Sequence, residues 1–281
     1  MTKRAPIWLI ANAASGSHDA ATIDAVIRLF SRSGRPIARR IPLGLRPLPT
    51  GQQARAAGVS LIIIHAGDGT ISSVTAGLGD WDGDILVLPG GTMNLLSRAL
   101  HGDLPSIDIA ERAAREDIPS APIPVISGGG FRALAGIVAG PTSAWGEVRE
   151  HLRNADLAGL AASVPEALNE TLSGDSIAVD GIDEEFEAVY LQPATTGMDV
   201  RGIVARNAVD LIAHGWAWLA GDFRKGPSVE LGTFPRVVLR HNGPIGLLVD
   251  GEKAETRSVA TFSADLSSQR FLSCKGGIEW S

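Results

Sequence analysis

The first third of the chain alternates short apolar segments with glycine-bearing turns and amphipathic segments. The apolar segments contain no polar alternation, which is typical of strands that are covered on both faces. They are residues 7–12, 60–66 and 84–89, and a further strand is expected at 36–43. Strand–helix alternation of this kind predicts an α/β domain over residues 1–120, with a doubly wound, mostly parallel sheet.

The amphipathic segments carry helix signals. From about Asp19, apolar residues repeat at three- and four-residue spacing, and Gly34 predicts the end of this helix. Thr50 predicts the cap of a short helix that ends at Gly58. Helices are also expected after the last two strands, where apolar residues share a face: Ile71, Val74 and Leu78, then Leu95, Leu96, Ala99 and Leu100.

The composition of the sequence and its pattern of expected elements change after about residue 120. The Pro- and Gly-rich segment 119–130 indicates a crossing into a second domain, residues 121–281, whose last strand can return to the first domain. Strands are expected at 131–139, 176–180, 185–192, 228–233, 235–241, 245–250 and 258–263, and helices near 144–168 and 202–220. This pattern predicts a largely antiparallel, β-rich domain.

The amino-acid composition restricts the binding partners and the cellular compartment that we expect for the protein. The formal net charge of the 281 residues is −6, which gives no basic footprint for nucleic acid. The one cysteine, Cys274, excludes an internal disulfide and favours a reducing cytoplasm. No segment approaches the roughly 18 apolar residues of a membrane span. We therefore expect a soluble cytoplasmic protein. If its substrate is a lipid, the protein must meet the bilayer from the side, at the inner face of the membrane.

Three glycine-bearing turns follow three of the strands. They are Asn12-Ala13-Ala14-Ser15-Gly16, Gly67-Asp68-Gly69-Thr70 and Pro89-Gly90-Gly91-Thr92-Met93-Asn94. Glycine lets backbone N–H groups approach phosphate oxygens, and a following helix N-terminus adds favourable partial charge. Asp68 would repel phosphate, so we expect it to engage Mg²⁺ or to fix the loop. Each turn alone could be an ordinary turn, and Thr92 could merely cap a helix; three at the strand ends of one sheet favour a phosphate site.

These turns carry a family resemblance. In order, the motifs Asn12-x-x-Ser15-Gly16, Gly67-Asp68-Gly69-Thr70 and Gly91-Thr92-x-Asn94 resemble the nucleotide-binding motifs of the diacylglycerol kinase catalytic domain, which sphingosine, ceramide and bacterial lipid kinases share. Far downstream, Asp250-Gly251-Glu252 is similar to the family's Asp-Gly-Glu, and Gly221-Asp222-Phe223-Arg224 resembles a segment of bacterial members.

The resemblance implies an ATP- and Mg²⁺-dependent lipid kinase that transfers the γ-phosphate to a diacylglycerol-like hydroxyl, with its active site in the cleft between two domains. Glu252 would be the general base, Asp250 would position it or help hold the metal, and Asp68 would be a second metal ligand. The residues implied in nucleotide binding are Asn12, Ser15, Gly16, Gly67, Gly69, Thr70, Gly91, Thr92 and Asn94.

Two departures from the family pattern bear on activity. Ala66 stands where the family usually has a first glycine, and an alanine is tolerated there if its φ is not positive. Leu95 stands where many members have an aspartate, which removes a candidate metal contact from that loop.

Alternatives stay open from the sequence. An NAD kinase shares a related Gly-Gly-Asp-Gly motif, and a degenerate kinase fold could bind nucleotide or lipid without catalysis. His65 could touch a ligand or simply be buried, and Trp216 and Trp218 could face a lipid or a core. The sequence does not decide whether the protein forms a homodimer. No G-x-G-x-x-G follows the first strand, which disfavours a dinucleotide-dependent oxidoreductase.

Overall fold

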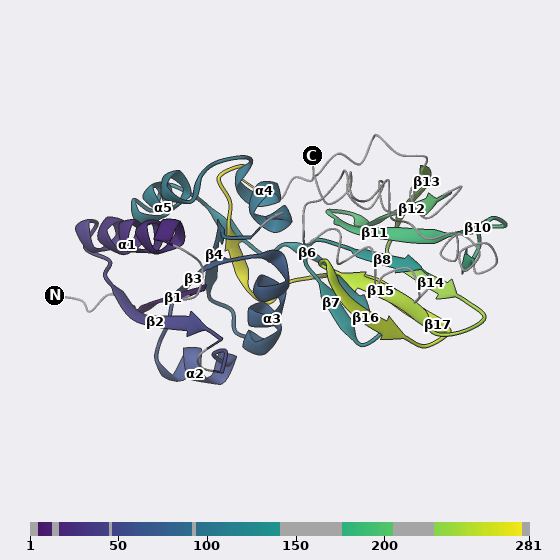
Figure 1. Cartoon of the computed structure of the whole chain (residues 1–281), viewed down its shortest axis with the longest axis horizontal. Coiled ribbons are helices and arrows are strands. Elements are labelled where there is room, and N and C mark those ends of the chain that lie inside the picture. Colours follow the sequence, from purple (N-terminus) through teal and green to yellow (C-terminus); the bar gives the residue numbers. More distant parts are fainter. Residues whose placement is uncertain are drawn as a thin grey trace. The chain divides into compact units, whose positions relative to one another are not determined.

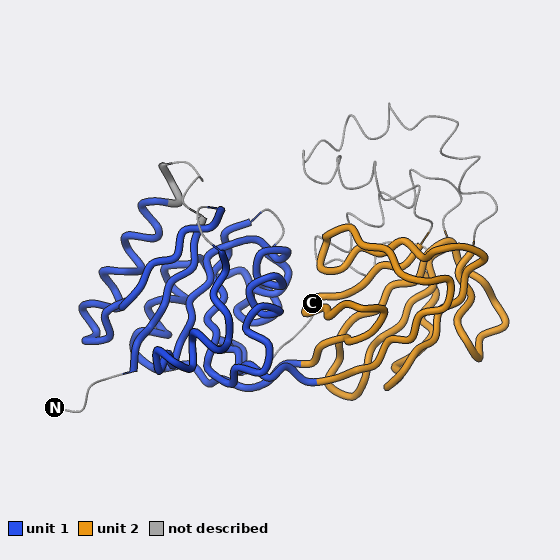
Figure 2. The backbone as a smooth tube through the Cα atoms, turned by 90° about the horizontal axis from the view of Figure 1, so that it is seen from below, with its two compact units in different colours: residues 1–123, 266–280 blue, residues 124–265, 281 orange. Residues whose placement is uncertain are grey.

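The computed structural model describes residues 5–12, 17–44, 47–91, 94–140, 176–204 and 228–276. The chain divides into two compact units, shown in different colours in Figure 2. Unit 1 contains residues 1–123 and 266–280, and unit 2 contains residues 124–265. Because the chain leaves unit 1 after Ile123 and re-enters it at Leu266, unit 1 is built from both ends of the sequence.

Unit 1 is centred on a six-stranded sheet with the order β2-β1-β3-β4-β18-β5. Neighbouring strands from β2 to β18 run parallel, and only β5 pairs antiparallel with its neighbour β18. The strands are β1 (Ile7–Asn12), β2 (Ile37–Leu43), β3 (Leu61–Ala66), β4 (Asp84–Pro89), β5 (Ser120–Ala121) and β18 (Arg270–Leu272). The predicted doubly wound, mostly parallel sheet is confirmed.

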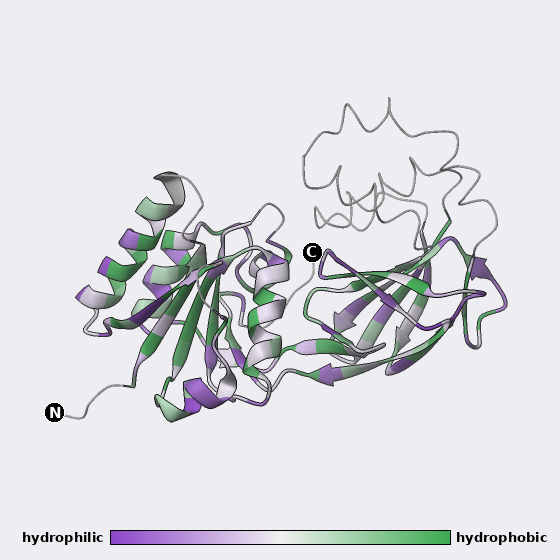
Figure 3. Ribbon diagram, turned by 60° about the horizontal axis from the view of Figure 1, so that its bottom comes forward, coloured by the Kyte–Doolittle hydropathy of each residue, from purple (hydrophilic) through white to green (hydrophobic). Residues whose placement is uncertain are grey.

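Helices cover both faces of this sheet, with α1 and α5 on one side and α2 and α3 on the other (Figure 1). The central strands are apolar along their length, as Figure 3 shows, because both faces are buried. Alternate residues of β1 and β3 therefore pack against α1 and α5, and the residues between them face the other layer. The helices are α1 (Ser17–Arg32), α2 (Gly51–Ala56), α3 (Asp68–Leu78), α4 (Leu95–His101) and α5 (Ser106–Ala114).

The described residues of unit 2 form two six-stranded sheets with the orders β10-β9-β14-β17-β6-β7 and β13-β12-β11-β8-β15-β16. Buried residues from both sheets form one core between them, which makes unit 2 a sandwich of antiparallel pairs. The strands are β6 (Pro124–Gly128), β7 (Phe131–Ala133), β8 (Ile137–Gly140), β9 (Ile177–Val179), β10 (Glu185–Phe186), β11 (Ala188–Ala194), β12 (Gly197–Ile203), β13 (Ser228–Phe234), β14 (Arg236–Arg240), β15 (Ile245–Val249), β16 (Glu252–Thr256) and β17 (Val259–Leu266). The predicted antiparallel β-rich second part is confirmed.

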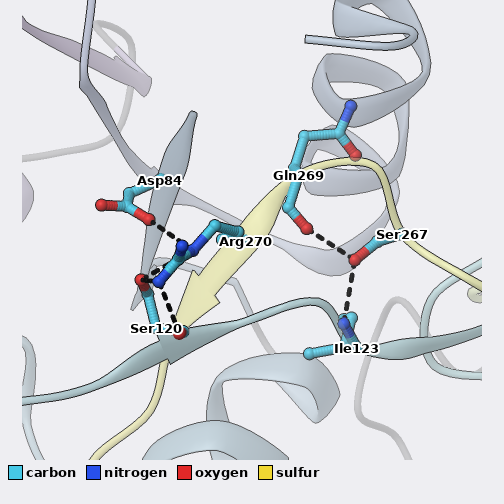
Figure 4. A network of polar contacts seen from close by, with 6 residues as sticks. All are labelled: Asp84, Ser120, Ile123, Ser267, Gln269 and Arg270. Carbon is cyan, nitrogen blue, oxygen red and sulfur yellow. Dashed lines mark hydrogen bonds and ion pairs between the residues drawn. The ribbon is translucent and has the colours of Figure 1, made fainter. Parts of the chain in front are cut away.

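The two chain passages at the border of unit 1 are tied together by the polar network in Figure 4. The Ser267 hydroxyl accepts a hydrogen bond from the Ile123 amide (2.9 Å) and donates one to the Gln269 carbonyl (2.7 Å). Arg270 donates to the hydroxyl and the carbonyl oxygen of Ser120. The carboxyl-terminal return of the chain is thus fixed to the segment by which the chain leaves unit 1.

Some expected elements differ from the observed ones. The strand expected at 131–139 is two strands, β7 and β8, separated by residues 134–136, whose amide groups turn toward the side chain of Asp250. The helix expected at 202–220 is wrong at its start, since residues 202–203 end strand β12. The rest of that helix, and the one expected near 144–168, lie outside the described residues. Within the described part of the chain, no helix is long and apolar enough to cross a membrane.

Candidate functional site

The carboxyl ends of β1, β3 and β4 lie at one edge of the unit 1 sheet. The register pairs Ala11 with His65 and Ala66 with Pro89, so the segments that follow these strands begin side by side. In doubly wound sheets this edge is where ligands bind. His65 is buried in β3, with 4% of its surface exposed.

The turns after β3 and β4 pack against each other through glycines. A Cβ on Gly91 would lie 2.5 Å from the Gly67 Cα, and a Cβ on Gly90 would lie 2.7 Å from the Ala66 amide nitrogen. No side chain fits at such distances without moving backbone, so these glycines permit the close approach of the two turns. Ala66 is tolerated beside them because positive φ among the described non-glycine residues occurs only at Asn94, Glu116 and Asp250.

Asp68 joins the two turns. It opens helix α3, and its carboxylate oxygens accept hydrogen bonds from the amides of Leu95 and Leu96 (both 3.0 Å), the first two residues of α4. These amides have no partner within their own helix, and the N-terminus of a helix favours negative charge. Asp68 therefore acts as a remote cap of α4. Leu95 makes this contact through its backbone amide. The contact therefore does not require the aspartate side chain that many family members have at this position.

Asn94 closes the turn that precedes α4. Its backbone is left-handed (φ 53°, ψ 40°), a conformation that asparagine tolerates better than most residues. Its side-chain oxygen accepts from the Gly91 amide (2.8 Å), and its side-chain nitrogen donates to the Gly91 carbonyl (2.9 Å). This reciprocal pair fixes both ends of the turn.

The structure places only part of the predicted nucleotide motifs. Gly67, Asp68, Gly69 and Thr70 lie together at the start of α3, next to Gly91 and Asn94. The backbone of Asn12 ends β1 at the same edge. Ser15, Gly16, Thr92 and the segment Gly221–Arg224 lie outside the described residues.

In unit 2, the sequence Asp250-Gly251 forms the two-residue turn of the β15–β16 hairpin. Val249 pairs with Glu252 across the turn, and Asp250 and Gly251 have positive φ values of 49° and 83°. This is the geometry of a type I′ hairpin turn, for which Asp-Gly is a preferred sequence. Glu252 is therefore the first residue of strand β16, and its side chain is exposed.

The Asp250 side chain binds the backbone between β7 and β8. Its carboxylate accepts hydrogen bonds from three successive amides: Leu134 (3.0 Å), Ala135 (2.7 Å) and Gly136 (3.0 Å). The Asp250 amide in turn donates to the Gly136 carbonyl. Only 5% of the residue is exposed, so the turn that precedes Glu252 is anchored by charge-assisted hydrogen bonds in a buried position.

Tyr190 on β11 belongs to the same surroundings. A Cβ on Gly136 would lie 2.9 Å from the Tyr190 hydroxyl oxygen, so the ring passes directly over that glycine. Burial raises the pKa of Tyr190, and the nearby Asp250 carboxylate raises it further. The phenol therefore stays protonated at neutral pH. Sequence reasoning missed Tyr190, and no local motif singles it out.

Asp68 and Asp250 were predicted as catalytic residues and metal ligands, and both are bound to backbone amides. Each Asp68 oxygen accepts one of the bonds to α4. One oxygen of Asp250 already accepts from three amides. Among the residues described, no group of three or more His, Cys, Asp or Glu side chains could hold a metal ion.

Comparison with known proteins agrees with these motifs. The family model of the diacylglycerol kinase catalytic domain matches residues 6–125, somewhat less than half of the chain. Residues 6–125 thus match the diacylglycerol kinase catalytic domain. The match contains the turns around Asp68 and Asn94, while Asp250 and Glu252 lie beyond it. No curated protein matches the sequence.

Solved structures extend the similarity to the whole chain. Two structures of a provisionally assigned diacylglycerol kinase from Bacillus anthracis str. Sterne align with TM-scores of 0.65 and 0.63 at 17% identity. A structure of a diacylglycerol kinase from the same organism gives 0.63 at 16% identity. Each alignment covers 99% of this chain and 100% of the other. At this identity the likeness shows a shared fold.

The cap of α4 by Asp68 can be tested by amide exchange. Asp68→Ala removes both acceptors, and loss of a helix cap costs about 0.5–2 kcal/mol, so the Leu95 and Leu96 amides should exchange several-fold faster. Hydrogen exchange followed by NMR measures this. Asp80→Ala is the control, because the Asp80 side chain is 86% exposed in an ion pair with Arg55. Unchanged exchange at Leu95 and Leu96 would contradict the assignment.

The packing of the two turns predicts an asymmetry between their glycines. Gly91→Ala should lower the free energy of unfolding by about 1–3 kcal/mol, because its Cβ overlaps the Gly67 backbone. Gly67→Ala should cost less than about 1 kcal/mol, because its Cβ would lie 3.4 Å from the Gly91 Cα, an ordinary contact. Urea unfolding of the two variants measures the difference. Equal costs, or the reverse order, would show that the turns are not in this contact.

Proposed function

We propose that the protein is an ATP- and Mg²⁺-dependent lipid kinase that transfers the γ-phosphate to the hydroxyl of a diacylglycerol-like acceptor. The observation that carries the proposal is the joined pair of glycine turns at the carboxyl edge of the unit 1 sheet, within residues that match the diacylglycerol kinase catalytic domain. The proposal assigns nucleotide binding to unit 1, and the acceptor and its base to unit 2.

The electrostatics of the two turns support a phosphate site. Asp68 occupies the first position of α3, where its charge would oppose a phosphate. Its carboxylate instead accepts from the N-terminus of α4, so that helix end compensates the negative charge. The N-terminus of the eleven-residue helix α3 is then available to phosphate oxygens through the turn Gly67–Thr70.

Only one of the two predicted metal ligands is retained in the proposal for a magnesium ion. Mg²⁺ commonly binds to one or two carboxylates together with substrate phosphates. Asp68 is the carboxylate of the glycine turns at this edge of the sheet, while one oxygen of Asp250 accepts from three backbone amides. We therefore assign only Asp68 as a metal ligand in the proposal. The ion would neutralise charge on the transferring phosphoryl group.

Glu252 is the proposed general base. The acceptor oxygen would bond to the γ-phosphorus, the bond from that phosphorus to the β-phosphate oxygen would break, and ADP would leave. The proton of the acceptor hydroxyl would pass to the Glu252 carboxylate. The Asp250 anchor supports this role, because it fixes the turn from which Glu252 extends. Asp250 is thus a positioning residue.

The acceptor and the compartment follow from the same proposal. A diacylglycerol-like substrate resides in a membrane, so the enzyme would act at a membrane surface. The lone Cys274 favours a reducing compartment, which agrees with the cytoplasmic face. Phosphorylation of NAD in place of lipid would make the protein an NAD kinase, and nucleotide binding without transfer would make it a sensor.

The test is transfer of labelled phosphate from [γ-³²P]ATP with Mg²⁺ to a total lipid extract, separated by chromatography. Wild type should yield a labelled lipid, and Glu252→Gln should reduce its rate by about 10²–10⁴-fold through loss of the base. Glu255→Gln is the matched control: Glu255 is also exposed on β16 and, three residues on, lies on the opposite face of the strand. It should retain the wild-type rate.

The opposite results would overturn the proposal. If folded wild-type protein labels no lipid, the lipid kinase proposal is contradicted, whether or not the protein labels NAD. Equal losses in Glu252→Gln and Glu255→Gln would show that Glu252 has no specific role in the transfer.

A further inference from the structure

An aromatic ring covers the backbone to which Asp250 is anchored. Tyr190 on β11 pairs directly with Val138 on β8, and its ring reaches Gly136, which lies just before β8. These two residues are diagonal neighbours across antiparallel strands, a separation that an aromatic side chain can span. A Cβ on Gly136 would lie 2.9 Å from both the Cε2 atom and the hydroxyl oxygen of Tyr190. The ring therefore occupies the space that a side chain at position 136 would need.

Gly136 connects this ring with the Asp250 turn. The Gly136 amide donates to the Asp250 carboxylate (3.0 Å), and the Gly136 carbonyl accepts from the Asp250 amide (3.0 Å). Only 7% of Tyr190 and 5% of Asp250 are exposed. Charge-assisted hydrogen bonds are stronger where water is excluded. The ring over Gly136 therefore limits both the movement of this backbone and the access of water to it.

A neutral aromatic side chain suits this position. The pKa of Tyr190 is raised by burial, and further by the Asp250 carboxylate, so the ring carries no charge that would repel its neighbour. A leucine at position 190 would also be neutral. It is too short to span the diagonal to Gly136, which is a distance for aromatic and long side chains.

Glu252 extends from the anchored turn on the other face of the sheet. It pairs with Val249, which packs against the core of unit 2. Tyr190 stands between two core residues of β11, Val189 and Leu191, so its side chain projects from the face directed away from the core. An effect of the Tyr190 ring on Glu252 therefore passes through Gly136 and the Asp250 turn.

We propose that Tyr190 is a positioning residue of the phosphoryl-transfer reaction: by holding Gly136 against the Asp250 turn, it sets the placement of Glu252. This inference rests on the proposed lipid kinase function, in which Glu252 is the base. Misplacement of a catalytic group by about 1 Å can cost about 100-fold in rate. Loss of the ring should therefore slow the chemical step and leave ATP binding by unit 1 unchanged.

The first test follows the anchor by hydrogen exchange and NMR. In Tyr190→Leu, the amides of residues 134–136 should lose several-fold more protection than the amides of β14, which lie in the other sheet of unit 2. Phe186→Leu is the matched control, because Phe186 is a buried ring of unit 2 that a Cβ on Gly202 would overlap. In that variant, residues 134–136 should not be singled out. Equal losses at β14 and at residues 134–136 in Tyr190→Leu would overturn the inference.

The second test is a double-mutant cycle on the transfer of labelled phosphate from ATP to lipid. Tyr190→Leu should lower kcat by about 10-fold or more at an unchanged KM for ATP, and Tyr190→Phe, which keeps the ring, should retain most of the rate. In the Glu252→Gln background, Tyr190→Leu should cost less than about twofold, because no base is left to position. Phe186→Leu should keep a kcat close to that of wild type.

The outcomes distinguish this inference from the proposed function. If Tyr190→Leu lowers kcat equally in both backgrounds, or no more than Phe186→Leu does, the ring is only structural and the inference alone is overturned. If Glu252→Gln leaves the transfer rate unchanged, or wild type labels no lipid, the proposed function is overturned in its base or as a whole, and this inference with it.

Discussion

In both units, an aspartate carboxylate accepts hydrogen bonds from backbone amides of a different segment of the chain. Asp68 binds the first amides of α4, 27 and 28 residues away, and Asp250 binds amides 114 to 116 residues away. Backbone amides in these positions would otherwise lack partners, and an ionised carboxylate is a strong acceptor for them. The positions of both signature turns depend on these contacts.

This arrangement gives the acidic residues of the motifs a structural role. A carboxylate that fixes its own turn is needed for the geometry of the site even if it touches no substrate. Asp68 has this structural role, since it anchors the start of α4. Asp250 is an anchor, and the proposed base is Glu252, two residues later, whose side chain is exposed. The glycines next to Asp68 have a matching structural reason, because the turns of Gly67 and Gly91 are in backbone contact.

Much of the fold could be predicted from local patterns. Apolar runs without alternation gave the ends of β3 and β4 correctly, and Thr50 caps α2 as expected. Strand β16 was missed, although Asp250-Gly251 is a recognisable hairpin signal, because the match to the family motif outweighed the interpretation of these residues as a polar β-turn. The interruption between β7 and β8 could not be predicted, since its cause is a side chain more than one hundred residues away.

The candidate site was predictable in its residue types and less so in its contacts. The sequence pattern indicated that Asp68 either binds metal or fixes the loop, and the structure shows the second. The ring of Tyr190 over Gly136 depends on strand register and on side-chain placement across a sheet. No short motif encodes such relations.

The central claim, that the Asp250 carboxylate anchors the turn and Glu252 performs the chemistry, is tested most directly by urea unfolding of Asp250→Ala beside Glu252→Gln. Removing Asp250 leaves three amides without their acceptor and puts alanine at positive φ, so the free energy of unfolding should fall by about 3 kcal/mol or more. Glu252→Gln should change it by less than about 0.5 kcal/mol. Wild-type stability of Asp250→Ala, with phosphoryl transfer lost, would contradict the account and return Asp250 to the chemistry itself.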